Sequence, residues 1–107
     1  MPSNIFTSQG TLSTTGTKLY EARGDSAVVT RLMITNIDGT SCNITVKRYD
    51  YKTRTLTQIF QYNLLSGYVY EDTGPYLMNA RDYFIASSDQ PNTTFLIQGN
   101  DLYIWWK

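Results

Sequence analysis

The chain has 107 residues, which is the size of one domain, and its 9 Lys and Arg balance 9 Asp and Glu. It contains no His and a single cysteine, which excludes Ser-His-Asp and Cys-His catalysis, an intramolecular disulfide and Cys/His metal spacings. Zero net charge argues against a nucleic-acid ligand, and no apolar stretch approaches the roughly 20 residues that cross a membrane.

The beginning of the chain is rich in Ser, Thr and Gly and has few apolar residues apart from Ile5, Phe6 and Leu12. Such a composition is typical of a segment that orders only against a partner or at the edge of a sheet. We therefore expect residues 1–16 to be a flexible N-terminal arm or an edge strand, and residues 17–107 to form a single domain.

Two apolar segments follow, at 27–36 and 42–47, and both alternate with the period of two that indicates strands. The first is apolar on both faces, which is typical of a central strand. Its predicted faces are Val28, Leu32 and Ile34 on one side, and Val29 and Met33 on the other. In the second segment one face consists of Cys42, Ile44 and Val46. The turn residues of 36–41, with Gly39 among them, predict that the two strands form a hairpin.

The rest of the chain carries further strand candidates, separated by turn residues such as Gly74-Pro75. They span 55–63, where Leu56, Phe60 and Tyr62 share a face, and then 68–71, 76–79, 83–87, 93–98 and, after a turn at 99–101, 102–106. Seven or eight short strands at this spacing predict an all-β chain that folds as an antiparallel β-sandwich, of jelly-roll or immunoglobulin-like type.

Carboxylate pairs are the remaining starting point for acid/base chemistry, and the candidates are Glu71 with Asp72 and Asp82 with Asp89. Adjacent strand residues point to opposite faces, so Glu71 and Asp72 are not expected to act together. The sequence lacks phosphate-binding glycine motifs and the spaced acidic residues of a calcium loop. We predict no catalytic residue, no cofactor and no metal, and a protein that is not an enzyme.

Two short motifs admit a binding role beside a simpler one. The tripeptide Arg23-Gly24-Asp25 is the one that integrins read, but its glycine also suits a turn, and the sequence leaves its role open. Residues 47–54 interleave basic residues with Tyr49 and Tyr51, as a platform for single-stranded nucleic acid would. In a neutral domain a solvated hairpin is the better interpretation. We expect neither a nucleic-acid nor a membrane partner.

Aromatic residues make up 14% of the chain, with 9 Tyr, 4 Phe and 2 Trp. Tyr and Trp combine apolar area with a hydrogen-bonding group, which suits contacts between proteins, although aromatic residues also favour strands. The two tryptophans are adjacent, so on a strand they point to opposite faces and at least one is expected at a surface or interface. The predicted partner contacts are Tyr49, Tyr51, Tyr68, Tyr70, Tyr103, Trp105 and Trp106.

After the Thr/Ser/Gly-rich start, three segments follow one another in a characteristic order: Thr17–Ala22, Ala27–Asn36 and Cys42–Val46. This order resembles small virion proteins of tailed bacteriophages, over residues 10 to 50 and beyond them only in the rhythm of the strands. The resemblance implies a β-sandwich that attaches by many weak contacts, as capsid decoration or cement proteins and tail accessory proteins do.

These observations predict a non-enzymatic virion structural protein, in the first place a capsid decoration or cement protein that stabilises the phage head. Its partners would be the major capsid protein or other virion proteins, its working unit a small homo-oligomer, and its location the virion, after assembly in the host cytoplasm. Two alternatives stay open. One is a tail, neck or fibre accessory protein, and the other is a carbohydrate-binding sandwich that uses aromatic rings as sugar platforms.

Overall fold

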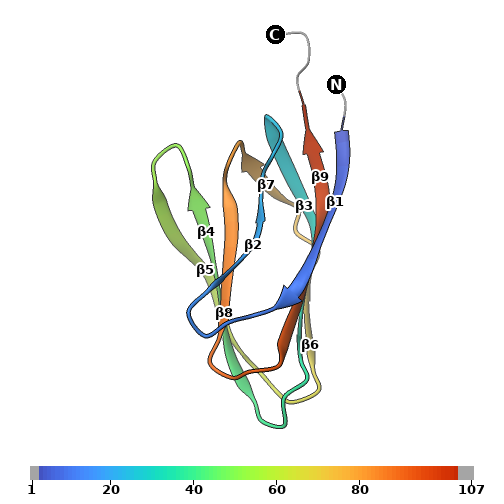
Figure 1. The fold of residues 1–107 in the computed structure, drawn as a ribbon, viewed down its shortest axis with the longest axis vertical. Helices are drawn as coiled ribbons and strands as arrows, with labels where there is room; N and C mark the ends of the chain where they lie inside the picture. The colour runs from blue at the N-terminus through green and yellow to red at the C-terminus, as the bar shows by residue number, and fades with distance from the viewer. Residues whose placement is uncertain (1–2, 104–107) are drawn as a thin grey trace.

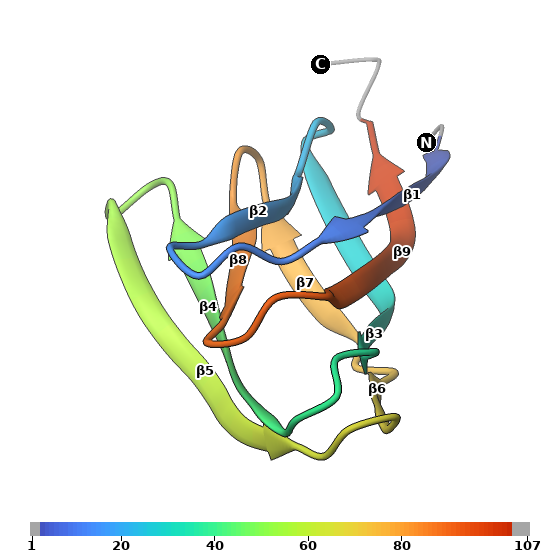
Figure 2. The ribbon, with the colours of Figure 1, turned by 60° about the horizontal axis from the view of Figure 1, so that its bottom comes forward.

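The computed structural model describes residues 3–103, and these form nine β-strands and no helix (Figure 1). In chain order the strands are β1 (Ser3–Thr11), β2 (Thr17–Glu21), β3 (Ser26–Asn36), β4 (Cys42–Asp50), β5 (Thr55–Leu64), β6 (Val69–Asp72), β7 (Tyr76–Asn79), β8 (Tyr83–Ser88) and β9 (Thr93–Leu102). They pair antiparallel in two sheets that pack face to face (Figures 1 and 2). The predicted all-β sandwich is confirmed, with nine strands rather than seven or eight because the polar N-terminal part contributes β1 and β2. In this part of the chain no helix is long and apolar enough to cross a membrane.

The order of the strands is that of a jelly roll. Sheet A has the order β1-β9-β3-β6, with β7 also paired to β3, and sheet B has the order β2-β8-β4-β5. Most connections therefore cross from one sheet to the other. In an immunoglobulin fold the first two strands lie in one sheet, whereas β1 and β2 lie in different sheets. Of the two predicted types, the chain adopts the jelly roll.

The predicted hairpin between 27–36 and 42–47 is wrong, because β3 lies in sheet A and β4 in sheet B. β3 pairs with β9 on one side and with β6 and β7 on the other, so it has no free edge for β4. The connection turns a corner of the sandwich, where the buried side chain of Asn36 donates hydrogen bonds to the carbonyls of Thr40 and Leu64, at 2.9 and 3.0 Å. Turn residues predict that the chain reverses, but not whether the flanking strands pair.

A β-bulge at Thr30 changes the faces of β3. The register with β9 shifts between Val29 and Arg31, so Val29 and Leu32 are both buried while Val28 lies on the opposite face. The predicted groups, Val28 with Leu32 and Ile34 and Val29 with Met33, are therefore wrong. One inserted residue reverses the alternation beyond it, and the sequence carries no signal for the insertion.

A second bulge has the same effect on β5. Ile59 has no partner where the register against β4 shifts, between the pairs that Phe60 and Gln58 form. Phe60 and Tyr62 stand opposite buried residues of β4 and face the interior, whereas Leu56 stands opposite Tyr49 on the outer face. The predicted common face of Leu56, Phe60 and Tyr62 is wrong for this reason.

β9 runs without interruption to Leu102, so the predicted turn at 99–101 is wrong, and Leu102 ends β9 instead of beginning a separate strand. Gly99 marks a close approach of neighbouring strands: a Cβ atom there would lie 2.0 Å from the carbonyl oxygen of Val28 and 2.7 Å from the ring of Phe6. Glycine inside a strand has this use as well as its use in turns. Residues 104–106 of the predicted strand lie outside the described part of the chain.

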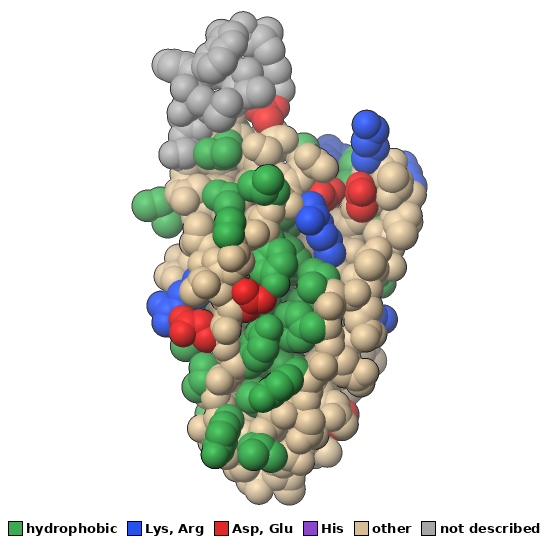
Figure 3. All heavy atoms as spheres, turned by 180° about the vertical axis from the view of Figure 1, so that it is seen from behind, with side chains coloured by type: hydrophobic (Ala, Val, Ile, Leu, Met, Phe, Trp, Pro, Cys, Tyr) green, Lys and Arg blue, Asp and Glu red, His purple; other side chains and the backbone are tan. Residues whose placement is uncertain are grey.

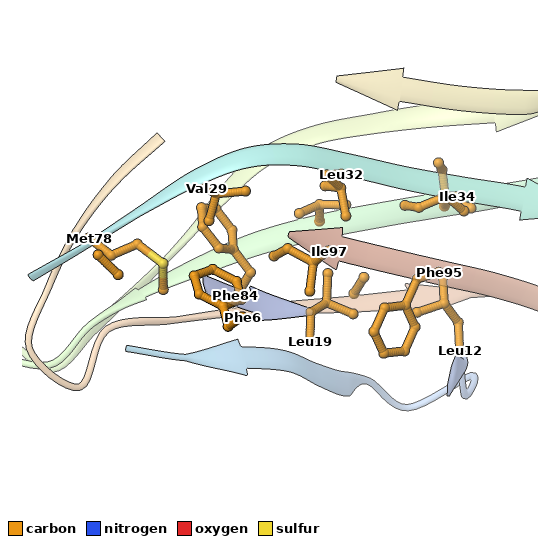
Figure 4. Packing of buried hydrophobic residues seen from close by; sticks show 14 of the residues in the cluster. Phe6, Leu12, Leu19, Val29, Leu32, Ile34, Met78, Phe84, Phe95 and Ile97 are labelled. Atoms are coloured by element: carbon orange, nitrogen blue, oxygen red, sulfur yellow. The ribbon is translucent and has the colours of Figure 1, made fainter. Parts of the chain in front are cut away.

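The N-terminal segment helps to build the core. β1 pairs with β9 over its whole length, so the described residues from 3 to 11 form an edge strand and not a flexible arm. Phe6 and Leu12 are buried, and Figure 4 shows them among the core side chains that fill the space between the sheets. The other buried hydrophobic residues are Leu19, Ala22, Ala27, Val29, Leu32, Ile34, Cys42, Ile44, Val46, Leu64, Met78, Phe84, Ala86, Phe95 and Ile97.

The buried carboxylate of Asp82 holds two turns together at one end of the sandwich. It accepts hydrogen bonds from the backbone N–H groups of Asn79 and Tyr51, both at 3.0 Å, and pairs with the guanidinium of Arg48 at 3.2 Å. A buried charge is tolerated when it is paired and hydrogen-bonded in this way. In the described chain no buried side-chain oxygen or nitrogen lacks a hydrogen-bond partner.

Candidate interaction surface

The sandwich has two lateral sides at which edge strands of the two sheets face each other. β1 and β2 form one side, and β5 faces β6 and β7 on the other (Figure 2). Figure 3 shows the molecule from this second side, where hydrophobic side chains gather in a band along its length. Four aromatic residues of these edge strands lie along this side, and we call these four residues the aromatic stripe: Phe60, Tyr62, Tyr70 and Tyr76.

Tyr70 of the stripe links the two sheets. Its ring centroid lies 4.8 Å from that of Phe60 and 5.5 Å from that of Tyr62, in tilted arrangements. Tyr76 packs edge-on against the buried ring of Phe84 in sheet B, at 5.6 Å. Such aromatic pairs contribute about 0.5–1.5 kcal/mol beyond their burial. The stripe thus joins the edges of the sheets, while Tyr62 remains 49% exposed to solvent.

The carboxylate of Asp72 binds the hydroxyl groups of the stripe. It accepts a hydrogen bond from the hydroxyl of Tyr76 and a long one, at 3.5 Å, from that of Tyr70. The hydrogen bond to Asp72, together with burial, raises the pKa of Tyr76 to about 12. Burial and the charge of Asp72 raise the pKa of Tyr70 as well. Both tyrosines therefore keep their protons over the whole physiological range and remain hydrogen-bond donors.

Glu71 points away from this cluster, to the outer face of sheet A, where it pairs with Arg31 at 2.6 Å. Asp72, its neighbour in sequence, faces the stripe. The two carboxylates lie on opposite faces of the strand, as the alternation of the sequence predicts. Each carboxylate is engaged in its own structural contact.

Apolar side chains of β6, β7 and the loop before β6 are also exposed to solvent, and by alternation with Tyr70 and Tyr76 those of Val69 and Leu77 point to the outer face of sheet A. Leu65 and Tyr68 precede β6, Val69 begins it and Leu77 lies in β7, and each is at least half exposed, up to 71% for Leu77. Apolar surface that extends beyond isolated residues is typical of sites that contact another molecule. The stripe and this border form the candidate interaction surface.

The predicted contact residues are spread over several surfaces, and only Tyr68 and Tyr70 belong to this one. Tyr49 lies on the outer face of sheet B, where its ring stacks on that of Tyr83 with 4.7 Å between the centroids. The ammonium group of Lys18 lies 4.4 Å from the centroid of the same Tyr83 ring. Tyr49 is therefore half covered by a contact within the chain.

Tyr51 lies in the turn between β4 and β5, between two arginines. Arg81 donates a hydrogen bond of 2.9 Å to its hydroxyl and stands 5.2 Å from its ring, and Arg54 stands 5.9 Å from the same ring. The basic residues of 47–54 do not share one face, because Arg48 points inward to Asp82. The arrangement is a local cation–π cluster.

Tyr103 lies on the opposite lateral side and lines a recess of about 540 Å³ between β1 and β2. The recess also contains Tyr20 and the buried Asp101, whose carboxylate accepts hydrogen bonds from the hydroxyl of Tyr20 and the backbone N–H groups of Arg23 and Gly24. Burial and Asp101 raise the pKa of Tyr20 above its usual range. Trp105 and Trp106, the remaining predicted contacts, lie outside the described residues.

The glycine of the tripeptide Arg23-Gly24-Asp25 has a structural explanation. A Cβ atom on Gly24 would lie 2.4 Å from the carbonyl oxygen of Leu102, so this loop can pass the end of β9 only with glycine. The N–H of Asp25 donates to the same carbonyl at 2.8 Å. The loop is therefore held to β9 by its backbone, as well as by Asp101.

Three residues of the stripe, Phe60, Tyr62 and Tyr76, are absent from the predicted contacts. Phe60 and Tyr62 carry a signal in the sequence, because they alternate on a predicted strand that has no charged residue. Tyr76 follows Gly74-Pro75 and has no comparable signal. That these rings meet Tyr70 depends on which strands become the edges of the two sheets.

The carboxylates of the described chain are placed for structure. Within residues 3–103 no group of three or more His, Cys, Asp or Glu is arranged to hold a metal ion. Of the pair Asp82 and Asp89, Asp82 is buried among its turn contacts, and Asp89 accepts hydrogen bonds from the backbone and side chain of Asn43, at 2.8 and 3.0 Å.

Comparison with known proteins shows a likeness of fold and no likeness of sequence that would indicate a family. No protein-family model matches the chain, and no curated protein matches its sequence. Among solved structures, one from the work "Bacillus endospore appendages form a novel family of disulfide-linked pili" is similar, with a TM-score of 0.56 and 11% identity over 96% of this chain and 88% of that chain. At this identity the likeness shows a common β-sandwich architecture, which many unrelated functions use.

Proposed function

We propose that the protein is a non-enzymatic structural component of a tailed-bacteriophage virion, in the first place a capsid decoration or cement protein. The observation that carries the proposal is the aromatic stripe with its exposed apolar border. A half-covered row of Tyr and Phe offers a partner both apolar area and hydroxyl groups, which is the composition of protein contact surfaces. Tyr62, at 49% exposure, is the most exposed residue of the stripe itself.

Attachment to a repetitive shell explains how such a modest surface suffices. Each copy needs only a weak contact, because neighbouring contacts on the same particle raise the effective concentration. The proposed partners are the major capsid protein or other virion proteins and further copies of this chain. The proposed contacts are Tyr68 and Tyr70 with the rest of the stripe, and Trp105 and Trp106 at the C-terminus.

The fold likeness to a pilus protein is compatible with a structural role and adds one contrast. The work on that structure describes disulfide-linked pili, whereas Cys42, the single cysteine of this sequence, is fully buried between the sheets. A thiol in that position is not available to a neighbouring subunit unless the sandwich opens. The proposed attachment is therefore non-covalent.

Two other functions remain as candidates. A tail, neck or fibre protein would use the same surface but occur in far fewer copies per particle than a head protein. A carbohydrate-binding module is favoured by the exposed rings of Tyr62 and Tyr68, since stacking on a sugar needs only an accessible ring face. Binding of the purified chain to a glycan array tests that candidate directly.

Purified particles provide the test of the main proposal. Quantitative mass spectrometry should find this chain in virions, in a copy number that matches the lattice of the head. Purified protein that is added to particles lacking it should then bind to them. Tyr62→Ala should weaken this binding at least tenfold. Ile5→Ala is the matched control, because Ile5 is 84% exposed but lies on the opposite lateral side. Absence of the chain from virions contradicts the proposal.

A further inference from the structure

Strand β5 is an open edge of the fold. It is the last strand of sheet B and has ten residues, and within residues 3–103 it pairs only with β4. Most of its side chains are exposed, and only Leu64 at its end is buried. An edge of this kind presents a row of backbone N–H and C=O groups to another strand.

Three other edge strands, β2, β6 and β7, carry the features by which proteins in solution prevent such pairing. β2 has only five residues, a register shift and the ion pair of Lys18 with Glu21 at 2.9 Å. β6 and β7 have four residues each, are separated by Gly74-Pro75 and include Glu71 and Asp72. Short strands, charges and proline are the usual protection of an edge.

β5 has almost none of these features. Its sequence, TLTQIFQYNL, contains no charged residue, no proline and no glycine. Its one interruption is the bulge at Ile59, beyond which Phe60–Leu64 pairs regularly with β4. β1 is also long and uncharged, but Phe6, the ring that it turns inward, is already stacked on Tyr20 at 3.7 Å. Tyr62 of β5 is half exposed instead, so another strand beside β5 would bury more ring surface.

We infer that a second copy of this chain pairs with β5 through its own β5, antiparallel and about a twofold axis, so that the two B sheets become one continuous sheet. The partner is argued from charge: because β5 is uncharged throughout, no register of this pairing places like charges opposite each other. Tyr62, on the inner face, is covered by the aromatic rings of the second strand. Gln61, on the outer face, places its side-chain amide next to the new pair of strands. Twofold pairing of identical surfaces is the commonest closed symmetry.

This inference rests on the proposed self-association of the chain and names the strand that performs it. Analytical ultracentrifugation of the full chain tests it, with two exposed glutamines on edge strands as a matched pair. The unmodified chain should be a dimer. Gln61→Lys should raise the dimer dissociation constant at least tenfold, because it places a lysine from each copy at the new contact. Gln9→Lys, the same change on β1, should leave the dimer intact.

Hydrogen exchange keeps the test informative if Gln61→Lys fails to fold. In the unmodified chain the amides of 60–63 that point away from β4 should become more protected as the protein concentration rises. A monomer at every concentration, a dimer unaffected by Gln61→Lys, or dissociation by Gln9→Lys overturns the inference. None of these results bears on whether the chain occurs in virions, so a failure of the inference is distinguishable from a failure of the proposed function.

Discussion

The ring of Tyr70 on β6 lies 4.8 Å from the ring of Phe60 on β5, so one aromatic pair joins the edge strands of the two sheets. No backbone hydrogen bonds connect these strands, because they belong to different sheets. The closure of this side of the jelly roll therefore depends on side chains. The same rings that close the sandwich form the surface to which we assign its contacts.

Replacement of Tyr70 tests the structural half of this double role. Tyr70→Ala removes both ring contacts and should lower the free energy of unfolding by about 2–3 kcal/mol. Tyr70→Phe keeps the ring and loses only the long hydroxyl contact, so it should change the free energy by less than about 1 kcal/mol. Equilibrium unfolding in urea measures both variants. Equal stability of the two variants would contradict the closing role of the ring.

Asp82 should be among the most sensitive polar residues of the fold. Asp82→Ala leaves two backbone N–H groups, of Tyr51 and Asn79, without their acceptor and separates Arg48 from its partner, which lies against a buried carboxylate. We expect a loss of about 3–5 kcal/mol. Asp89→Ala, which removes exposed hydrogen bonds to Asn43, is the control and should cost about 1 kcal/mol or less. Thermal and urea unfolding should rank the two variants in this order.

Gly99 and Gly39 are a matched pair for testing close packing, because Gly99 is closely surrounded by other atoms and Gly39 is not. Gly99→Ala places a methyl group against the Val28 carbonyl and the Phe6 ring, and should destabilise the protein by about 3 kcal/mol. Gly39→Ala has no atom within 4 Å of the new Cβ, and should change stability by about 0.5 kcal/mol or less. If Gly99→Ala were as stable as Gly39→Ala, the Val28 carbonyl of β3 and the Phe6 ring of β1 would not approach β9 as closely as described.

Ionisation of the Tyr76 hydroxyl should lower the free energy of unfolding as the pH rises in the alkaline range. Its pKa is about 12 in the folded chain and about 10 in an unfolded one. The folded state holds this proton more tightly, so the contribution is complete below pH 10 and is lost as the pH rises through 12. Asp72→Asn removes the carboxylate that raises the pKa of Tyr76, and should flatten the decline of stability over this range.

Denaturation curves at stepped pH, with tyrosinate absorbance recorded in parallel, check this expectation. Tyr76→Phe lacks the ionising group and should also flatten the profile, but less than Asp72→Asn, which in addition removes the charge that raises the pKa of Tyr70. An unchanged profile in both variants would mean that another alkaline group controls the loss of stability.

Trp105 and Trp106 are the two tryptophans of the chain, so its tryptophan fluorescence reports on the C-terminus alone. If these residues contact a partner, their emission should move to shorter wavelength when the protein attaches to particles, because burial removes the rings from water. Replacing both by Phe should abolish the signal and weaken attachment. An emission maximum that is the same free and attached would remove them from the proposed contacts.

Much of the fold is present in the alternation of the sequence. The strands at 76–79 and 83–88 lie where a period of two and flanking turn residues predict them, to within a residue. The predictions that fail have a common cause. The faces of β3 and β5 change at bulges at Thr30 and Ile59, and Gly99 continues a strand instead of turning it. Each depends on a neighbouring strand that the local sequence does not contain.

The candidate surface was less accessible to prediction than the strands. Tyr68 and Tyr70 stand out as aromatic residues with a hydrogen-bonding group, and both lie at the surface to which we assign contacts. Tyr49 and Tyr51 have the same chemistry but are engaged by Tyr83 and Arg81 within the chain. Composition identifies residues that suit contacts, whereas only packing decides which of them lie together on one surface.

The sequence by itself determined that this protein is a β-sandwich, because the period of its apolar residues sets which segments have one face to bury. It also determined that histidine-based catalysis and disulfide closure within the chain are impossible, since those residues are missing. The tertiary structure alone decided that β3 and β4 part into different sheets and that β5 becomes an edge beside β6. Strand partners are chosen by competition among all the strands for backbone hydrogen bonds and apolar cover, and that competition is not encoded in any single segment.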